Sequence, residues 1–177
     1  KVNSDLNDTL GNFIHRTLTF INRFFKGEIP HAEGLDEDDK GILQTIREKV
    51  SRVGASIENC RLAEALREVV DLSRVGNQYL NRKEPWNLIK SDKQKAANVL
   101  YVAAQIVKAL AILLAPFIPF TAEELWKLLN LPGNVHKQRW EDALKPLPVG
   151  HKIGKAKPLF RKVEANEEEL QAMLEKV

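Results

Sequence analysis

Residues 3–26 show the clearest amphipathic pattern in the chain, with apolar residues at steps of three and four. At about 100° per residue these residues fill one half of a helical wheel: Leu6, Leu10, Phe13, Ile14, Leu18, Ile21, Phe24 and Phe25. Asn12 and Arg16 lie one turn apart on the opposite, polar half. Gly27 and Pro30 follow where a helix is expected to end. The pattern predicts one helix that buries its apolar face.

Two further helices are predicted between residue 36 and Pro85. The acidic run 36–39 places negative charge in a first helical turn, where the helix dipole favours it. Apolar residues at helical spacing carry this second helix to about Asn59. A third helix follows almost at once, with Leu62 on its inner face, and it ends before Pro85 because proline cannot continue a helix.

A fourth helix is expected to begin at Ser91 or Asp92, either of which can act as an N-cap. It runs to about Ala115 and is apolar on most sides, as a central helix of a bundle is. Thr121 with Glu124 three positions later has the spacing of a capping box and predicts the start of a fifth helix. Helices joined by short connections predict an all-α helix bundle.

The character of the chain changes after residue 131. Prolines and glycines interrupt short segments, of which 152–155 and 159–163 are either short strands or part of an extended tail. Residues 167–176 have the pattern of a short terminal helix. We therefore expect a bundle over residues 1–131 and, over residues 132–177, a tail that packs back on it.

Composition narrows the class of protein. The chain has 177 residues, 44% of them hydrophobic and 29% charged, as in ordinary soluble domains. Its net charge of +3 permits a nucleic-acid partner without requiring one. Cys60 is the single cysteine, which excludes a disulfide framework and a thiolate-only metal site. The most apolar stretch, residues 99–120, contains Gln105 and Lys108 and favours a buried helix over a membrane span. No signal peptide is expected before the first helix.

Enzymatic signatures are absent from the sequence. There is no glycine-rich phosphate loop, no nucleophile elbow or catalytic triad pattern, and no Glu-x-x-His pair of a di-iron bundle. We expect no catalytic residue and no metal site. The acidic runs 36–39 and 167–169 are explained by helix capping and solubility.

Two groups of residues are candidates for binding. Asn12 and Arg16 are one helical turn apart, so their amide and guanidinium can reach the same ligand edge. Together they either read base edges or belong to a solvated helix face. The second candidate is Trp86, just beyond the end of the third helix and next to Arg82 and Lys83.

The indole of Trp86 is either a stacking platform for an unpaired base or a helix stop that packs on the core. In the first case Arg82 and Lys83 could hold phosphate. Trp126 is expected in the core and Trp140 is expected to anchor the tail.

Several segments resemble methionyl-tRNA synthetases. Residues 10–16 (LGNFIHR) and 20–27 (FINRFFKG) resemble the opening helix of the anticodon-binding domain of that family. Residues 84–86 (EPW) are similar to the segment after its third helix. Residues 114–126 (LAPFIPFTAEELW) resemble a motif that several class I synthetases share. Residues 150–160 (GHKIGKAKPLF) resemble the archaeal and eukaryotic type of the methionyl enzymes.

The resemblance implies a fold of the class I anticodon-binding type and a role in reading the CAU anticodon of initiator and elongator methionine tRNA. Trp86 matches the tryptophan on which the first anticodon base stacks. Asn12 and Arg16 match a pair that contacts the anticodon loop. Asn81 and Pro85 match neighbours that shape the pocket.

The family's catalytic motifs, HIGH and KMSKS, are absent from this chain. The resemblance implies that this part of the enzyme does not activate methionine and holds no cofactor. The parent enzyme would join methionine to its tRNA with ATP and magnesium. The implied partners are the anticodon stem-loop and the catalytic domain of the same chain, in the cytoplasm and away from membranes.

Two other functions fit part of the sequence. A helical protein-interaction scaffold would need no exposed Trp86 and would present an exposed apolar stripe. An anticodon domain of a leucyl, isoleucyl or valyl synthetase would share residues 114–126, but the segments around Asn12–Arg16 and 151–160 argue against it.

Overall fold

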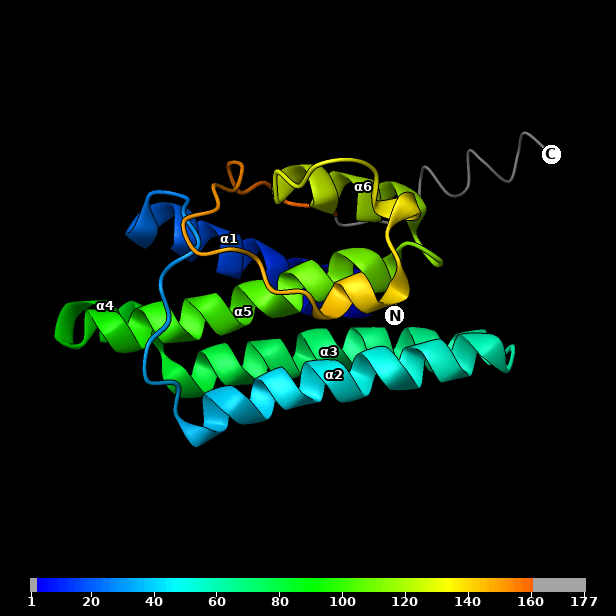
Figure 1. Cartoon of the computed structure of the whole chain (residues 1–177), viewed down its shortest axis with the longest axis horizontal. Coiled ribbons are helices and arrows are strands. Elements are labelled where there is room, and N and C mark those ends of the chain that lie inside the picture. The colour runs from blue at the N-terminus through cyan, green and yellow to red at the C-terminus, as the bar shows by residue number, and fades with distance from the viewer. Residues whose placement is uncertain (1–2, 161–177) are drawn as a thin grey trace, which may run out of the picture.

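The computed structural model describes residues 3–160, and this part of the chain is helical (Figure 1). A π-helical segment, η1, precedes six α-helices and two short 3-10 turns: η1 Asn3–Gly11, α1 Asn12–Phe25, α2 Glu37–Glu58, α3 Leu62–Lys83, α4 Pro85–Ser91, α5 Lys93–Leu114, α6 Pro119–Leu128, η2 Val135–Lys137 and η3 Trp140–Leu144. Among the described residues, β-pairing is limited to one isolated antiparallel bridge between Glu28 and Lys152. The predicted all-α bundle is confirmed.

Helix α5 forms the centre of the bundle. Helices α2 and α3 pack along one side of it, and α1 and α6 pack on it from the other (Figure 1). α5 is long and apolar enough to cross a membrane, but 94% of its most apolar window is buried inside the protein. The prediction of a buried central helix is therefore confirmed.

The ends of α2 and α5 follow their capping residues. Asp36 is the N-cap of α2, and its carboxylate accepts a hydrogen bond from the Asp39 amide, while the Asp39 carboxylate accepts one from the Asp36 amide. Asp92 is the N-cap of α5 and accepts from the amide of Lys95. These side chains satisfy amides that have no partner within the first turn of a helix.

α3 ends at Lys83, before Pro85, as predicted. Pro85 then begins a short helix that was not predicted, α4, because its fixed φ suits the first helical position, where its missing N–H is not needed. Two local predictions are wrong. Pro119 likewise begins α6, so Thr121 lies inside that helix and forms no capping box with Glu124. Leu62 was expected on the inner face of the third helix, but it is 56% exposed, because it lies in the first turn of α3 at the end of the bundle.

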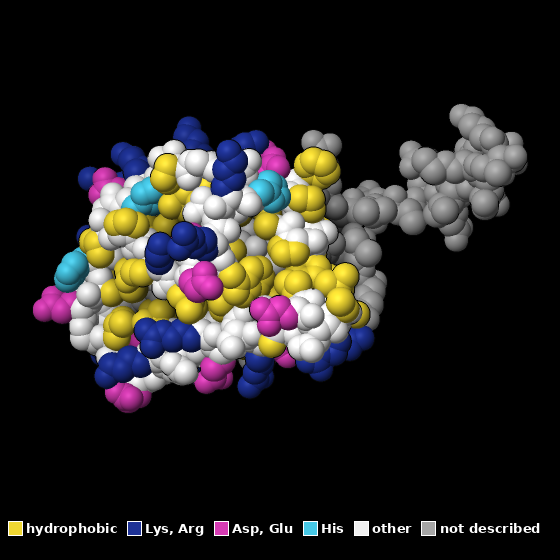
Figure 2. All heavy atoms as spheres, turned by 45° about the vertical axis from the view of Figure 1, so that its right-hand side comes forward, with side chains coloured by type: hydrophobic (Ala, Val, Ile, Leu, Met, Phe, Trp, Pro, Cys, Tyr) yellow, Lys and Arg dark blue, Asp and Glu magenta, His cyan; other side chains and the backbone are white. Residues whose placement is uncertain are grey.

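Hydrophobic side chains also remain on the surface. Figure 2 shows them interspersed with Lys, Arg, Asp and Glu on the face it presents. The exposed large hydrophobic residues of the described chain are Leu62, Phe120, Leu144 and Val149.

The segment after α6 packs on the bundle as extended chain and short turns. Trp140 donates from Nε1 to the carbonyl of Val50 on α2 at 2.9 Å, and its ring fills the space that Gly54 leaves open. Leu147 is buried and its amide bonds to the side chain of Gln105. The expected anchoring by Trp140 is confirmed. Residues 152–155 form no strand beyond the single bridge, and the predicted helix 167–176 lies outside the described residues.

We expect Trp140→Phe to lower the free energy of unfolding by about 0.5–1.5 kcal/mol, the usual net contribution of one hydrogen bond. The phenyl ring keeps most of the packing on Gly54 but has no donor for the carbonyl of Val50. Urea unfolding followed by far-UV circular dichroism measures the difference. No loss of stability would mean that the hydrogen bond contributes nothing.

Candidate nucleic-acid interface

The interface begins with the close approach of α1 to α3. A Cβ atom at Gly76 on α3 would lie 2.5 Å from the ring of Phe13 on α1, so only glycine leaves room for this ring. Phe13 is completely buried there. The contact brings the polar half of α1 to the edge of α3, where its side chains can reach those of the last turns of α3.

Arg16 joins the two helices at this edge. Its guanidinium donates to Asn77 Oδ1 at 3.3 Å and to Asn81 Oδ1 at 2.9 Å. Both acceptors are neutral amides, so these bonds orient the cation without neutralising it. Partial burial lowers the pKa of Arg16, but its pKa begins so high that the side chain stays charged at neutral pH.

Trp86 lies against the same guanidinium. It is the second residue of α4, and the Arg16 Cζ atom is 5.4 Å from the centre of its ring. Phe20, one turn after Arg16 on α1, contacts the indole with ring centroids 5.7 Å apart. Trp86 is partly buried, while Pro85 before it is buried. The indole therefore has the Arg16 guanidinium over its ring and Phe20 in contact with it, and it remains accessible in part.

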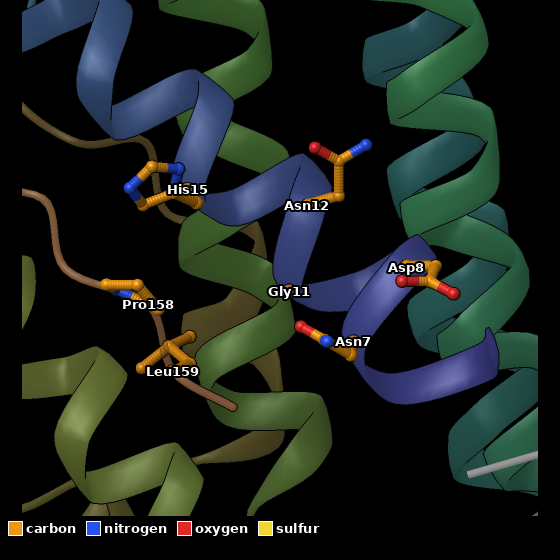
Figure 3. A pocket seen from close by; sticks show the side chains of 7 residues that line it. All are labelled: Asn7, Asp8, Gly11, Asn12, His15, Pro158 and Leu159. Atoms are coloured by element: carbon orange, nitrogen blue, oxygen red, sulfur yellow. The ribbon is translucent and has the colours of Figure 1, made fainter. Parts of the chain in front are cut away.

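Asn12 points elsewhere. It is exposed and lies one turn before Arg16 on α1, and in the described part of the chain no hydrogen bond joins it to Arg16 or Trp86. It lines a cleft of about 350 Å³ between α1, η1 and the returning tail (Figure 3). The other lining residues are Asn7, Asp8, Gly11, His15, Pro158 and Leu159.

Of the residues expected at the site, the structure brings Arg16, Asn81 and Trp86 together, with Pro85 directly before Trp86. Asn12 lies one turn before Arg16 on α1, but it lines the cleft. Their roles in binding remain predictions.

Asn77 and Phe20 also belong to this group, and sequence reasoning missed both. Asn77 bonds to Arg16 and to the carbonyl of Thr9, and Phe20 supports Trp86. The signal for Asn77 was its spacing: it lies one turn before Asn81 on α3, as Asn12 lies one turn before Arg16 on α1. Phe20 is not among the apolar half of the wheel predicted for residues 3–26, and no local signal in the sequence links it to Trp86.

The basic residues next to Trp86 are already paired. Arg82 makes two hydrogen bonds to Asp38, at 2.6 and 3.1 Å. Lys83 lies 2.6 Å from Asp36 and 2.9 Å from Asp39. Both cations are therefore engaged by carboxylates of α2 and its N-cap, which argues against the prediction that they hold phosphate.

The family model for the anticodon binding domain of methionyl tRNA ligase matches residues 29–175. The methionine–tRNA ligase of Pyrococcus abyssi is 44% identical over 163 residues, which are 92% of this chain and 22% of that protein. That of Metallosphaera sedula is 39% identical over 177 residues, 99% of this chain and 31% of that protein. The chain thus spans less than a third of either relative.

A solved structure has the same fold. The apo form of the Mycobacterium tuberculosis methionyl-tRNA synthetase superposes with a TM-score of 0.86 over 93% of this chain and 34% of that one, at 24% identity. The family match favours the methionyl type over the leucyl, isoleucyl and valyl alternatives. With the matched segment covering α2 to α6 and the residues that follow, the chain belongs to the family of anticodon-binding domains of methionyl-tRNA ligases.

Proposed function

We propose that this domain reads the CAU anticodon of initiator and elongator methionine tRNA. The observation that carries the proposal is the meeting of Arg16, Asn81 and Trp86 at one edge of the bundle. Proteins that read RNA by sequence usually bind bases that a loop turns outward, by stacking them and by bonding to their edges. This edge offers a partly accessible indole for stacking and a charged donor for base edges.

Each side chain has a distinct task in this proposal. Trp86 stacks the first anticodon base, with Phe20 supporting the indole from the side and Pro85 fixing the turn that presents it. Arg16 has five N–H donors and uses two of its nitrogens on Asn77 and Asn81, so donors remain for a base or phosphate. The two asparagines hold the guanidinium in place beforehand, which reduces the ordering that binding requires.

The cleft beside Asn12 extends this surface along α1. Its lining combines amide and imidazole groups with an apolar wall from Pro158 and Leu159 (Figure 3). We propose that Asn12 contacts the anticodon loop from this side of the helix. The loop would then lie along α1, with Trp86 near one end of the contact and Asn12 near the other.

The larger protein is proposed to be a methionine–tRNA ligase that uses ATP with magnesium and works in the cytoplasm. This is supported by the names of the relatives, of which the chain spans 22–31%. Within that enzyme, residues 1–131 would form the anticodon-binding bundle. Residues 132–177 would return along it toward the catalytic domain, which lies outside this chain and would carry the chemistry.

A binding experiment tests the function. The 177-residue chain is titrated with methionine tRNA and with the same tRNA carrying an altered anticodon, at one physiological salt concentration, because affinity for RNA depends on salt. We expect clearly tighter binding of the CAU form. Equal affinities would refute anticodon recognition, and tryptophan fluorescence that RNA leaves unchanged would favour a protein-interaction scaffold.

Arg16→Lys separates the shape of the guanidinium from its charge. Lysine keeps the positive charge but cannot donate to Asn77 and Asn81 at once while facing a base. We expect the affinity for the CAU form to fall about tenfold. The slope of log affinity against log salt should stay the same, because the number of cations is unchanged. Undiminished CAU affinity would show that charge alone suffices.

A further inference from the structure

The last turn of α3, residues 80–83, contacts two different parts of the protein. Asn81 faces α1 and accepts a hydrogen bond from Arg16 at 2.9 Å. Lys83, two residues later, faces the first turn of α2. The same helical turn therefore links the proposed RNA-contacting edge with the capped start of α2.

The contact with α2 is a network of charges in which the Asp39 and Lys83 side chains are largely buried and the Asp36 side chain is exposed. Lys83 Nζ lies 2.6 Å from Asp36 Oδ2 and 2.9 Å from Asp39 Oδ1. The Asp39 side chain is 3% exposed and also accepts a hydrogen bond from the fully buried hydroxyl of Tyr79 at 2.8 Å. Hydrogen bonds from Lys83 and from the Asp39 amide lower the pKa of Asp36 to about 2. Asp36 is thus charged at neutral pH.

A network of this kind holds its helices in one arrangement. A buried carboxylate left without its cation is strongly unfavourable, so Asp39 keeps Lys83 within bonding distance. Because Asp36 and Asp39 also form the capping box of α2, their own positions are fixed by the backbone. The end of α3 is consequently held against the capped first turn of α2.

The chain turns into α4 directly after Lys83. Glu84 has φ +47, in the left-handed region, which is unfavourable for a residue other than glycine. Its amide closes α3 by bonding to the carbonyl of Leu80, and its carbonyl accepts from the amide of Asn87 in α4. Pro85 and Trp86 follow. A single strained residue therefore sets the direction of α4 relative to the last turn of α3.

We propose that Lys83, anchored by Asp36 and Asp39, is a positioning residue for anticodon recognition: it fixes the last turn of α3, and with it the placement of Asn81 and Trp86. This inference rests on the function proposed above. It assigns Lys83 no contact with RNA, since its ammonium is engaged by carboxylates on α2.

The chain contains a matched control at Lys49. Its Nζ atom lies 2.6 Å from Glu68 and 2.6 Å from Asp71, so it too ties α2 to α3 through two carboxylates. Its side chain is 10% exposed and that of Lys83 is 15% exposed. The Lys49 contacts lie about 20 Å along α3 from residue 83. Lys49 therefore shares the stabilising role of Lys83 but not its place next to Trp86.

The experiment compares Lys83→Met, Lys49→Met and Trp86→Ala in the 177-residue chain, at a temperature where circular dichroism shows each variant folded. Dissociation constants are measured for methionine tRNA with the CAU anticodon and with an altered one. We expect Lys83→Met to weaken CAU binding by about 3- to 30-fold, in the range of mutations that act through a neighbour. It should reduce the preference for CAU, while Lys49→Met leaves both values within about twofold.

Two further readouts separate positioning from stability and from charge. The indole N–H resonance of Trp86, assigned by its loss in Trp86→Phe, is expected to shift in Lys83→Met and to stay in place in Lys49→Met. The salt slope of binding is expected to be unchanged in Lys83→Met. A slope lower by about one would instead mean that Lys83 contacts a phosphate, and would overturn the proposal.

The outcomes distinguish this inference from the function on which it rests. If Trp86→Ala leaves both affinities unchanged, the proposed function fails. If Trp86→Ala weakens binding but Lys83→Met and Lys49→Met reduce it alike, Lys83 is merely stabilising and only the inference fails. Should Lys83→Met not fold, Tyr79→Phe decides, because it removes only the hydroxyl bond to Asp39. An unchanged preference and an unmoved indole resonance in that variant would overturn the inference.

Discussion

Trp86→Ala is expected to weaken binding of methionine tRNA by about 5- to 150-fold, the equivalent of about 1–3 kcal/mol for the loss of one base stack on an aromatic ring. The indole is already held between Arg16 and Phe20, so little ordering is needed when a base arrives. Fluorescence anisotropy with a labelled anticodon stem-loop measures the change.

Trp86→Phe provides the first control, because a phenyl ring still offers a stacking surface and should retain part of the affinity. Trp140→Phe provides the second. Trp140 is bonded to Val50 on α2, away from Arg16, and its replacement should leave RNA binding unchanged. Full affinity in Trp86→Ala would contradict stacking on this residue, and an equal loss in Trp140→Phe would point to a general effect of lost stability.

The largest change in stability is expected for Phe13→Ala, at about 3–5 kcal/mol. The ring is completely buried against Gly76 of α3, where no Cβ atom intervenes. Its removal leaves a cavity between α1 and α3 that the two backbones cannot close without moving Arg16 away from Asn81. Urea unfolding measures the free energy, and tRNA titration of the folded variant measures the effect on binding.

Phe120→Ala is the matched control for Phe13→Ala. Phe120 is 81% exposed at the start of α6, so the same substitution there should change the free energy of unfolding by no more than about 0.5 kcal/mol. A loss below about 1 kcal/mol in Phe13→Ala would mean that the contact with Gly76 does not determine how α1 packs on α3.

Local patterns gave reliable predictions where local physics decides. Asp36 and Asp92 have short polar side chains that cap a helix within their own segment, so α2 and α5 begin where the sequence indicates. The apolar residues of α5 are surrounded by other helices, which their nearly uniform hydrophobicity implied. The prediction that Thr121 begins the fifth helix failed because Pro119, two residues earlier, already occupies the first helical position. The fixed φ of proline suits that position.

The candidate site shows the same division. Asn12, Arg16, Asn81, Pro85 and Trp86 could be named because their spacing and their resemblance to a family are properties of the chain itself. The partners of these residues could not be named in the same way. Phe20 has no local feature in the sequence that points to Trp86. Nothing near Arg82 and Lys83 in the sequence identifies Asp38, Asp36 and Asp39 as their partners.

By itself the sequence determined the order of the long helices, the capped starts of α2 and α5, the buried character of α5 and the family to which the domain belongs. These features depend on residues that are neighbours along the chain. Only the tertiary structure decided that Arg16 contacts Asn77, Asn81 and Trp86. It also decided that Lys83 forms ion pairs with Asp36 and Asp39. These contacts join residues more than 40 positions apart. They depend on how closely α1 approaches α3 over Gly76, which packing of the whole bundle sets.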